Sequence, residues 1–236
     1  MRRVLALLLL TATAALANGC SGADAQEAQD LLSQSNVAFA QVRSATFTAR
    51  LSLTGGPAEL NMTMSGGGYA HGRRAGDFYV LATAENFPFR DLVVVSRSGR
   101  VSMSIDGNSA GEVPLPDGST DNPLELVDLS QFVKDIRVEH GKVIDGASMV
   151  KVTGVIDTAS LAKGALGDLT GAGGEALDLS KSLGDMRMVL YVSEATHLPM
   201  RGLVDLPMEF AGEKIAMHLD FAYTSYNERV EFPGLR

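Results

Sequence analysis

The stretch "KIAMHLDFAYTSY" (residues 214–226) carries the clearest alternation of apolar and polar side chains in this chain of 236 residues. Its apolar positions are Ile215, Met217, Leu219, Phe221 and Tyr223. Because neighbouring side chains of a strand point to opposite faces, the pattern predicts a β-strand with one buried face. The stretch "PMRGLVDLPMEF" (199–210) precedes it across Ala211-Gly212-Glu213, which predicts a hairpin near the end of the chain.

The same period of two recurs upstream. The other alternating runs lie at residues 47–54, 60–65, 77–84, 91–97, 101–106, 136–144 and 148–156. Ser98-Gly99 and Asp145-Gly146 each separate two of these runs, and glycine accepts the positive φ that such two-residue turns require. We therefore expect about ten strands in one wide antiparallel sheet.

Three segments have helical spacing instead. In residues 24–43 the apolar or small positions are Leu31, Leu32, Ser35, Ala38, Phe39 and Val42. Residues 121–135 place Asn122 before Pro123, as at a helix N-terminus, and residues 158–169 give a weaker pattern interrupted by glycines. So few helices are not enough to cover such a sheet completely.

The chain begins with Met1-Arg2-Arg3, an apolar run, and small residues up to Gly19. A basic head, a short apolar run and a small-residue exit are typical of a bacterial export signal, so residues 1–19 are predicted to be a signal peptide. The strongly apolar part is shorter than the roughly 20 residues of a membrane-spanning helix. The sequence therefore predicts an exported protein.

Cys20 is the only cysteine of the chain, and two forms of processing fit its position. In a lipobox, small residues precede a cysteine that is acylated with diacylglycerol and becomes the new N-terminus. The alternative is an A-x-A site at Ala15-Leu16-Ala17, where cleavage before Asn18 would leave Cys20 as a free thiol. Because a lone thiol on an exported chain needs an explanation, we predict lipidation of Cys20, with palmitate-type acyl chains and a tether over residues 20–26.

Composition fits one globular domain, predicted over residues 27–236. The formal net charge is −8, and hydrophobic residues make up 45% of the chain. An acidic surface without a basic run argues against binding to nucleic acid and against polybasic adhesion to anionic lipid. With no cysteine after Cys20, stability must come from a packed core.

Several short pieces have a familiar order and spacing. Besides the cysteine after the signal, they are "VRSATFTARLSLTG" (42–55), "AGDFYV" (75–80), "NPLELVDL" (122–129), "VIDGASMVKVTGVID" (143–157) and "THLPMRGLV" (196–204). Taken together, the chain resembles the LppX/LprG-type lipoproteins of mycobacteria and other actinobacteria, which share a half-barrel fold with LolA and LolB. The resemblance implies an α+β fold, in which a single curved antiparallel sheet carries two or three helices on its concave face. It also implies a hydrophobic cavity for lipid acyl chains.

Methionines on the predicted strands are compatible with such a cavity, because methionine adapts to acyl chains of varied shape. They are Met62, Met64, Met103, Met186, Met188, Met208 and Met217. Filling gaps in an ordinary core is the commoner role of methionine, and this alternative stays open for each of them. The candidate cavity residues are Phe39, Leu51, Leu53, Met62, Met64, Phe78, Val80, Met103, Ile105, Phe132, Met188, Leu190, Met217, Leu219 and Phe221.

The motif "GNSAG" (107–111) suggests a different function, a serine hydrolase that uses Ser109 as its nucleophile with Asp205 and His218 as acid and base. A nucleophile elbow must lead directly into a helix, but Pro114 and Pro116 follow instead. We therefore rank this hypothesis last and expect a protein that is not an enzyme.

Other polar residues give weaker signals. The four histidines have no metal-ligand spacing, and we predict neither a metal nor a cofactor. Arg50, Arg187 and Arg201 lie on or beside predicted strands, where a guanidinium group is able to bind a lipid phosphate, although most strand arginines face solvent.

The leading hypothesis is a lipoprotein, anchored through Cys20 to the outer face of the cytoplasmic membrane. It would bind an acyl lipid or glycolipid and carry or present that lipid across the cell envelope, with an envelope transporter as a candidate partner. The alternative is a non-enzymatic envelope sensor or interaction protein with the same fold.

Overall fold

The computed structural model describes residues 24–56, 59–114, 133–158, 183–210 and 212–234. The predicted signal peptide, Cys20, Phe132, most of the predicted helix 121–135 and nearly all of the predicted helix 158–169 lie outside these residues. The described strands are β1 (Ser44–Thr54), β2 (Leu60–Tyr69), β3 (Phe78–Glu85), β4 (Asp91–Arg97), β5 (Arg100–Ile105), β6 (Asn108–Pro114), β7 (Val133–Ile144), β8 (Ala147–Ile156), β9 (Met186–Ser193), β10 (Pro199–Phe210) and β11 (Glu213–Tyr226).

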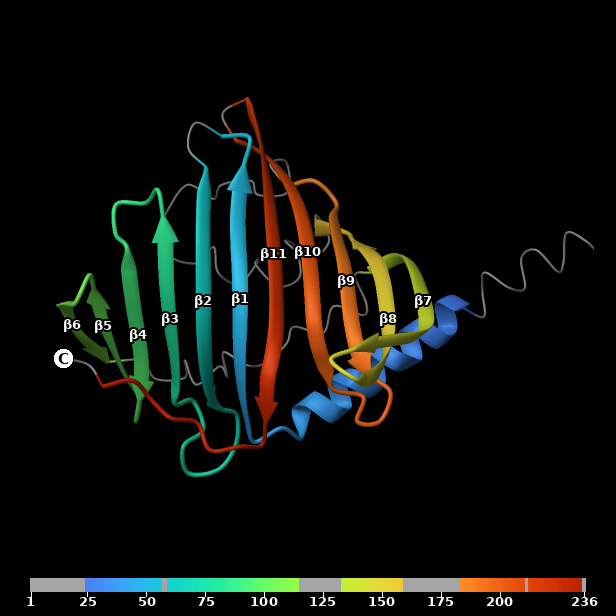
Figure 1. Cartoon of the computed structure of the whole chain (residues 1–236), viewed down its shortest axis with the longest axis horizontal. Helices are drawn as coiled ribbons and strands as arrows, with labels where there is room; N and C mark the ends of the chain where they lie inside the picture. The colour runs from blue at the N-terminus through green and yellow to red at the C-terminus, as the bar shows by residue number, and fades with distance from the viewer. Residues whose placement is uncertain (1–23, 57–58, 115–132, 159–182, 211, 235–236) are drawn as a thin grey trace, which may run out of the picture.

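All eleven strands belong to one sheet in the order β6-β5-β4-β3-β2-β1-β11-β10-β9-β8-β7. Every neighbouring pair is antiparallel. Figure 1 shows that the first and last strands of the chain, β1 and β11, lie side by side at the centre of the sheet. The outermost strands β6 and β7 do not pair with each other, so the sheet is open, as a half-barrel is.

Residues 24–40 form the N-terminal helix, and one side of it packs on the sheet. Its buried residues Ala28, Leu32, Ser35 and Phe39 recur every three or four positions, which is the predicted helical spacing. Ala28 and Leu32 share a core cluster with Ile136 of β7 and Val152 of β8. Figure 1 shows the helix in blue beside the β7–β10 side of the sheet.

The helix ends three residues earlier than its predicted end at Arg43. The amides of Gln41 and Val42 donate to the carbonyls of Ala38 and Phe39, which tightens the last turn. The imidazole Nε2 of His71 lies 2.7 Å from the carbonyl oxygen of Ala40, which has no partner within the helix.

The predicted two-residue hairpins are confirmed. Ser98-Gly99 has φ values of 51° and 74°, and Asp145-Gly146 has values of 51° and 81°. Positive φ at both turn positions matches the right-handed twist of the flanking strands. Asp106-Gly107 makes a third such turn, which leads into β6.

Two parts of the secondary-structure prediction are wrong. Residues 133–135, predicted to end a helix, begin strand β7, where Val133 pairs with Ile156 of β8. The region of the GNSAG motif forms strand β6, which was not predicted because Gly107, Gly111 and Pro114 interrupt any alternation.

The C-terminal tail, residues 227–234, is fixed against the sheet. The amide of Val230 donates to the hydroxyl of Tyr69 at 2.9 Å, and the side chain of Val230 is buried. The ring of Phe232 stacks on Tyr69 with 6.3 Å between centroids, and the guanidinium of Arg97 lies 4.7 Å from the Phe232 ring. These contacts keep the last described residues on the face opposite the helix.

Candidate functional site

Directly paired residues of an antiparallel ladder project to the same face, so the registers assign every strand residue to a face. Starting from Leu51 of β1, the pairing passes through Leu219 and Val204 to Met188 of β9. In the other direction Leu51 pairs with Met62 of β2, and Met62 pairs with Ala84 of β3. All of these side chains are apolar, and we call their side of the sheet the apolar face.

The neighbouring rows have the same character. The row through Ala49 contains Met64, Ala82 and Leu92 on one side and Phe221 on the other. The next row runs from Gly66 through Val80 and Val94 to Met103. The apolar face therefore extends from β5 to β9.

Thirteen of the candidate cavity residues lie on strands, and the registers place all of them on the apolar face. They are Leu51, Leu53, Met62, Met64, Phe78, Val80, Met103, Ile105, Met188, Leu190, Met217, Leu219 and Phe221. Phe39 reaches the same face from the helix, since its ring lies 5.4 Å from that of Tyr223. Phe132 is outside the described residues.

All seven strand methionines singled out from the sequence lie on this face as well. Met186 pairs with Ile156, and Met208 pairs with Ile215. Met188 is almost fully buried, whereas Met103 is 37% exposed and is among the most exposed large apolar side chains described. The group thus spans the range from core packing to an accessible apolar surface.

Small residues on the apolar face leave room for aromatic rings. A Cβ on Gly66 would lie 2.6 Å from the ring of Phe47, and a Cβ on Gly202 would lie 2.3 Å from the ring of Phe221. Each glycine is the direct cross-strand partner of its aromatic residue. The sequence analysis did not identify these glycines. A glycine at a strand position that alternation assigns to the apolar face is nevertheless a usable signal of such close packing.

An aromatic cluster anchors the C-terminal end of the helix to this face. The ring of Phe39 contacts Tyr223 and Tyr226, and the Tyr226 hydroxyl donates to the carbonyl oxygen of Pro199. Burial raises the pKa of Tyr223 to about 12 and shifts the pKa of Tyr226 in the same direction. Both phenols therefore remain neutral at physiological pH.

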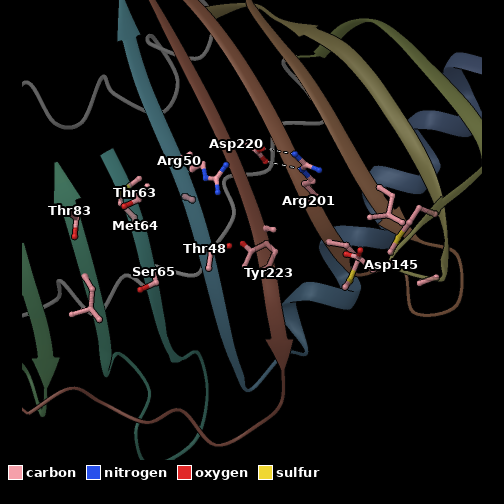
Figure 2. Close-up of a pocket in the computed structure, with 17 residues that line it drawn as sticks. Thr48, Arg50, Thr63, Met64, Ser65, Thr83, Asp145, Arg201, Asp220 and Tyr223 are labelled. Carbon is pink, nitrogen blue, oxygen red and sulfur yellow. Dashed lines mark hydrogen bonds and ion pairs between the residues drawn. The ribbon is translucent and has the colours of Figure 1, made fainter. Parts of the chain in front are cut away.

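The opposite, polar face carries the charged groups (Figure 2). Nε and Nη2 of Arg201 donate to the two carboxylate oxygens of Asp220 at 2.9 and 2.6 Å. Arg50 is the cross-strand partner of Asp220 on β1, and Figure 2 shows Asp220 between the two arginines. A hollow of about 900 Å³ here is lined by hydroxyls, by these charges, by the β7–β8 turn and by apolar residues that include Met64, Met149 and Met200.

Arg50, Arg187 and Arg201 therefore lie on the face opposite the seven methionines singled out from the sequence. Arg187 pairs with Asp205 in the β9–β10 ladder, and Asp205 accepts a hydrogen bond from Nδ1 of His218. A guanidinium on this face does not meet the head group of a lipid whose chains lie centrally on the apolar face.

The hydrolase triad is not assembled. Asp205 and His218 do pair, but Ser109 lies on the edge strand β6, six strand positions from β11. At about 4.8 Å per strand this separation is roughly 29 Å along the sheet, far beyond hydrogen-bond reach. Within the described ranges no three His, Cys, Asp or Glu residues are grouped to hold a metal, and no helix is long and apolar enough to cross a membrane.

Two solved structures are similar to this chain, and one of them, with a TM-score above 0.5, shows the same fold. LprF from Mycobacterium bovis matches with a TM-score of 0.53 and 16% identity, over 89% of this chain and 97% of LprF. The lipoprotein LppX of Mycobacterium tuberculosis matches with a TM-score of 0.49 and 13% identity, over 87% of this chain and 98% of LppX. No protein-family model and no curated protein sequence matches the chain. At these identities the likeness concerns the fold, and it confirms the half-barrel expected from the LppX/LprG resemblance.

Proposed function

We propose that this protein is a non-enzymatic, membrane-anchored lipoprotein that shelters the acyl chains of a lipid or glycolipid against the apolar face and carries or presents that lipid across the cell envelope. The observation that carries the proposal is the gathering of thirteen candidate residues from six strands, β1, β2, β3, β5, β9 and β11, on a single face. A half-barrel of similar fold in LprF supports it.

The energetics favour such a role for an extended apolar face. Each buried CH₂ contributes about 0.8 kcal/mol, so sheltering one 16-carbon chain is worth roughly 12 kcal/mol relative to water. A protein surface that competes with a bilayer for acyl chains must be broad, free of water and able to adapt to chains of different shape. The methionines and the small residues Ala49, Ala82 and Gly66 give the face that character.

The N-terminal helix already covers part of this face, over Ile136 and Val152. The ion pair that joins its edge to β7, between Nε2 of His140 and Oε1 of Glu27 at 2.8 Å, is exposed on both sides. Exposed pairs of this kind contribute little, so the helix is held mainly by its apolar side. We propose that movement of this helix contributes to lipid uptake and release.

The anchor is the second part of the proposal. Cys20 would carry the acyl chains predicted from the sequence, and two or more chains make membrane attachment effectively stable. The protein would then work at the outer face of the cytoplasmic membrane.

The test is native mass spectrometry of the full-length chain purified from an actinobacterial host, followed by extraction and identification of the released lipids. Adducts of acyl lipids together with a diacylglyceryl mass on Cys20 are expected. An N-terminus at Asn18 and a protein without adducts would contradict the anchored carrier. A stoichiometric protein partner without lipid would favour the envelope sensor.

A further inference from the structure

The β3–β4 connection, Asn86-Phe87-Pro88-Phe89-Arg90, carries an aromatic pair at one end of the sheet, an exposed Phe87 and a half-buried Phe89. Phe87 is 46% exposed and is the only aromatic residue among the large exposed apolar side chains of the described residues. Its ring meets that of Phe89 edge to face, with 4.6 Å between centroids. Figure 1 shows this connection at the same end of the sheet as the β1–β2 and β10–β11 connections.

The aromatic tip, residues 86–90, is held firmly at its base. The carboxylate of Asp106, from the β5–β6 turn, accepts hydrogen bonds from the amides of Arg90 and Asp91 at 2.9 and 2.8 Å. The amide of Ala84 donates to the carbonyl of Arg90 at 2.8 Å. The backbone at the base of the tip is therefore fixed, and the exposed Phe87 ring packs on the half-buried Phe89 ring, so binding costs little ordering entropy.

The tip adjoins the apolar face. Ala84 and Leu92, the nearest strand residues of that face, lie directly on either side of the connection. Arg90 lies opposite Ala84, so it adds a cation at the rim where the apolar face ends. Phenylalanine beside arginine at an exposed apolar rim fits the boundary between lipid chains and head groups.

We propose that the aromatic tip inserts Phe87 and Phe89 into the interfacial region of a lipid bilayer and so brings the rim of the apolar face against the membrane. Two aromatic residues bury at most about 500 Å², which is well below the roughly 800 Å² per partner of a stable protein interface. The patch is therefore too small for a protein partner but sufficient for shallow insertion. Glu85 and Asp91 flank the tip in the sequence, and the carboxylate of Asp106 accepts from the backbone amide of Arg90, so three acidic groups outnumber the one cation and the insertion is apolar rather than electrostatic.

Because the chain contains no tryptophan, a single tryptophan reports the position of the tip. We would place it with Phe87→Trp and, as a matched control, with Val143→Trp on β7, where the native side chain is 68% exposed. Each full-length variant is mixed with phosphatidylcholine vesicles whose acyl chains are brominated, since bromine quenches tryptophan on contact.

Insertion predicts roughly a twofold loss of fluorescence for Phe87→Trp and none for Val143→Trp, with no effect of added salt. Equal quenching of both variants, no quenching of either, or quenching that salt abolishes would overturn the proposal. Phe89→Trp provides a second probe of the same tip if the first substitution disturbs the edge-to-face contact of the two rings.

The quenching experiment distinguishes docking of the tip on a membrane from uptake of lipid by the protein. Quenching that persists after the vesicles are sedimented reports lipid taken up by the protein, whereas quenching lost with the vesicles reports docking. Docking without uptake would support the tip and leave the proposed carrier function to its own test by mass spectrometry.

Discussion

The ring of Phe221 on β11 occupies the space that a side chain on Gly202, its direct partner on β10, would need. A Cβ on Gly202 would lie 2.3 Å from the ring atoms Cε1 and Cζ. The close approach lets the aromatic ring lie along the apolar face at its centre.

Gly202→Ala should therefore destabilise the fold by about 1–3 kcal/mol, because the Phe221 ring must leave its position. Urea unfolding followed by circular dichroism measures the change. Gly234→Ala is the control, since nothing lies within 4 Å of a Cβ there. Equal stability of the two variants would show that the ring repacks without cost.

The two faces of β2 can be compared at adjacent residues. Met62 lies on the apolar face and Thr63 on the polar face. Met62→Glu should weaken acyl-lipid binding at least about tenfold, because a carboxylate displaces roughly two methylene contacts worth 0.8 kcal/mol each. Thr63→Glu should leave binding unchanged. Titration of a fluorescent fatty acid gives both affinities, and a similar loss in both variants would argue against the apolar face as the site.

Glu139 on the edge strand β7 is predicted to titrate at an unusually low pH. Hydrogen bonds from Lys151 and Lys142 lower the pKa of its carboxyl group from 4.5 to about 2. A lowered pKa in the folded state means that this contribution to stability is present above pH 4.5 and is lost as the pH falls toward 2. NMR titration of the carboxyl carbon should show the shift, and Lys151→Ala should move the midpoint upward. A titration midpoint near 4.5 in the unaltered protein would mean that the two lysines do not lower the pKa of Glu139.

The buried phenol of Tyr223 gives a complementary prediction at alkaline pH. Burial raises its pKa from 10.0 to about 12, so the neutral form stabilises the fold below pH 10 and that stabilisation is lost as the pH rises through 12. Phe39→Ala should lower the pKa, because it removes the ring 5.4 Å away. Ultraviolet titration of tyrosinate measures both proteins, with Phe87→Ala as the control at a distant aromatic residue. An identical titration of all three would show that Phe39 does not shield the phenol.

Much of the sheet was predictable because strand alternation is a local signal. Alternation gives each strand one apolar side, and a tight turn such as Ser98-Gly99 fixes the register of its own hairpin, β4–β5. Candidates such as Leu51 and Met217 were therefore assigned correctly to the apolar side of their own strands. What alternation does not contain is which strands become neighbours over long distances. The central pairing of β1 with β11 could not be deduced from the sequence pattern.

The misassigned segments have physical reasons. The apolar pair Phe132-Val133 continued a helical spacing, but Val133 packs so closely over Gly154 of β8 that a Cβ there would lie 2.3 Å from its Cγ1. This tertiary contact outweighs local propensity. The aromatic tip was missed because exposure of Phe87 depends on the hairpin geometry and not on any periodicity.

The central pairing of β1 with β11 also dictates an order of events when the protein is made. The strands β1–β6 and β7–β11 form two meanders, which are joined only by the pairing of β1 with β11. Until residues 213–226 are available, β1 and β10 both present unpaired backbone edges, which are open to pairing with other chains. Completion of the sheet must wait for the C-terminus and requires closure of a very long loop, so folding should be slow. A chain that crosses a membrane N-terminus first would thus remain dependent on a chaperone until its final strand emerges.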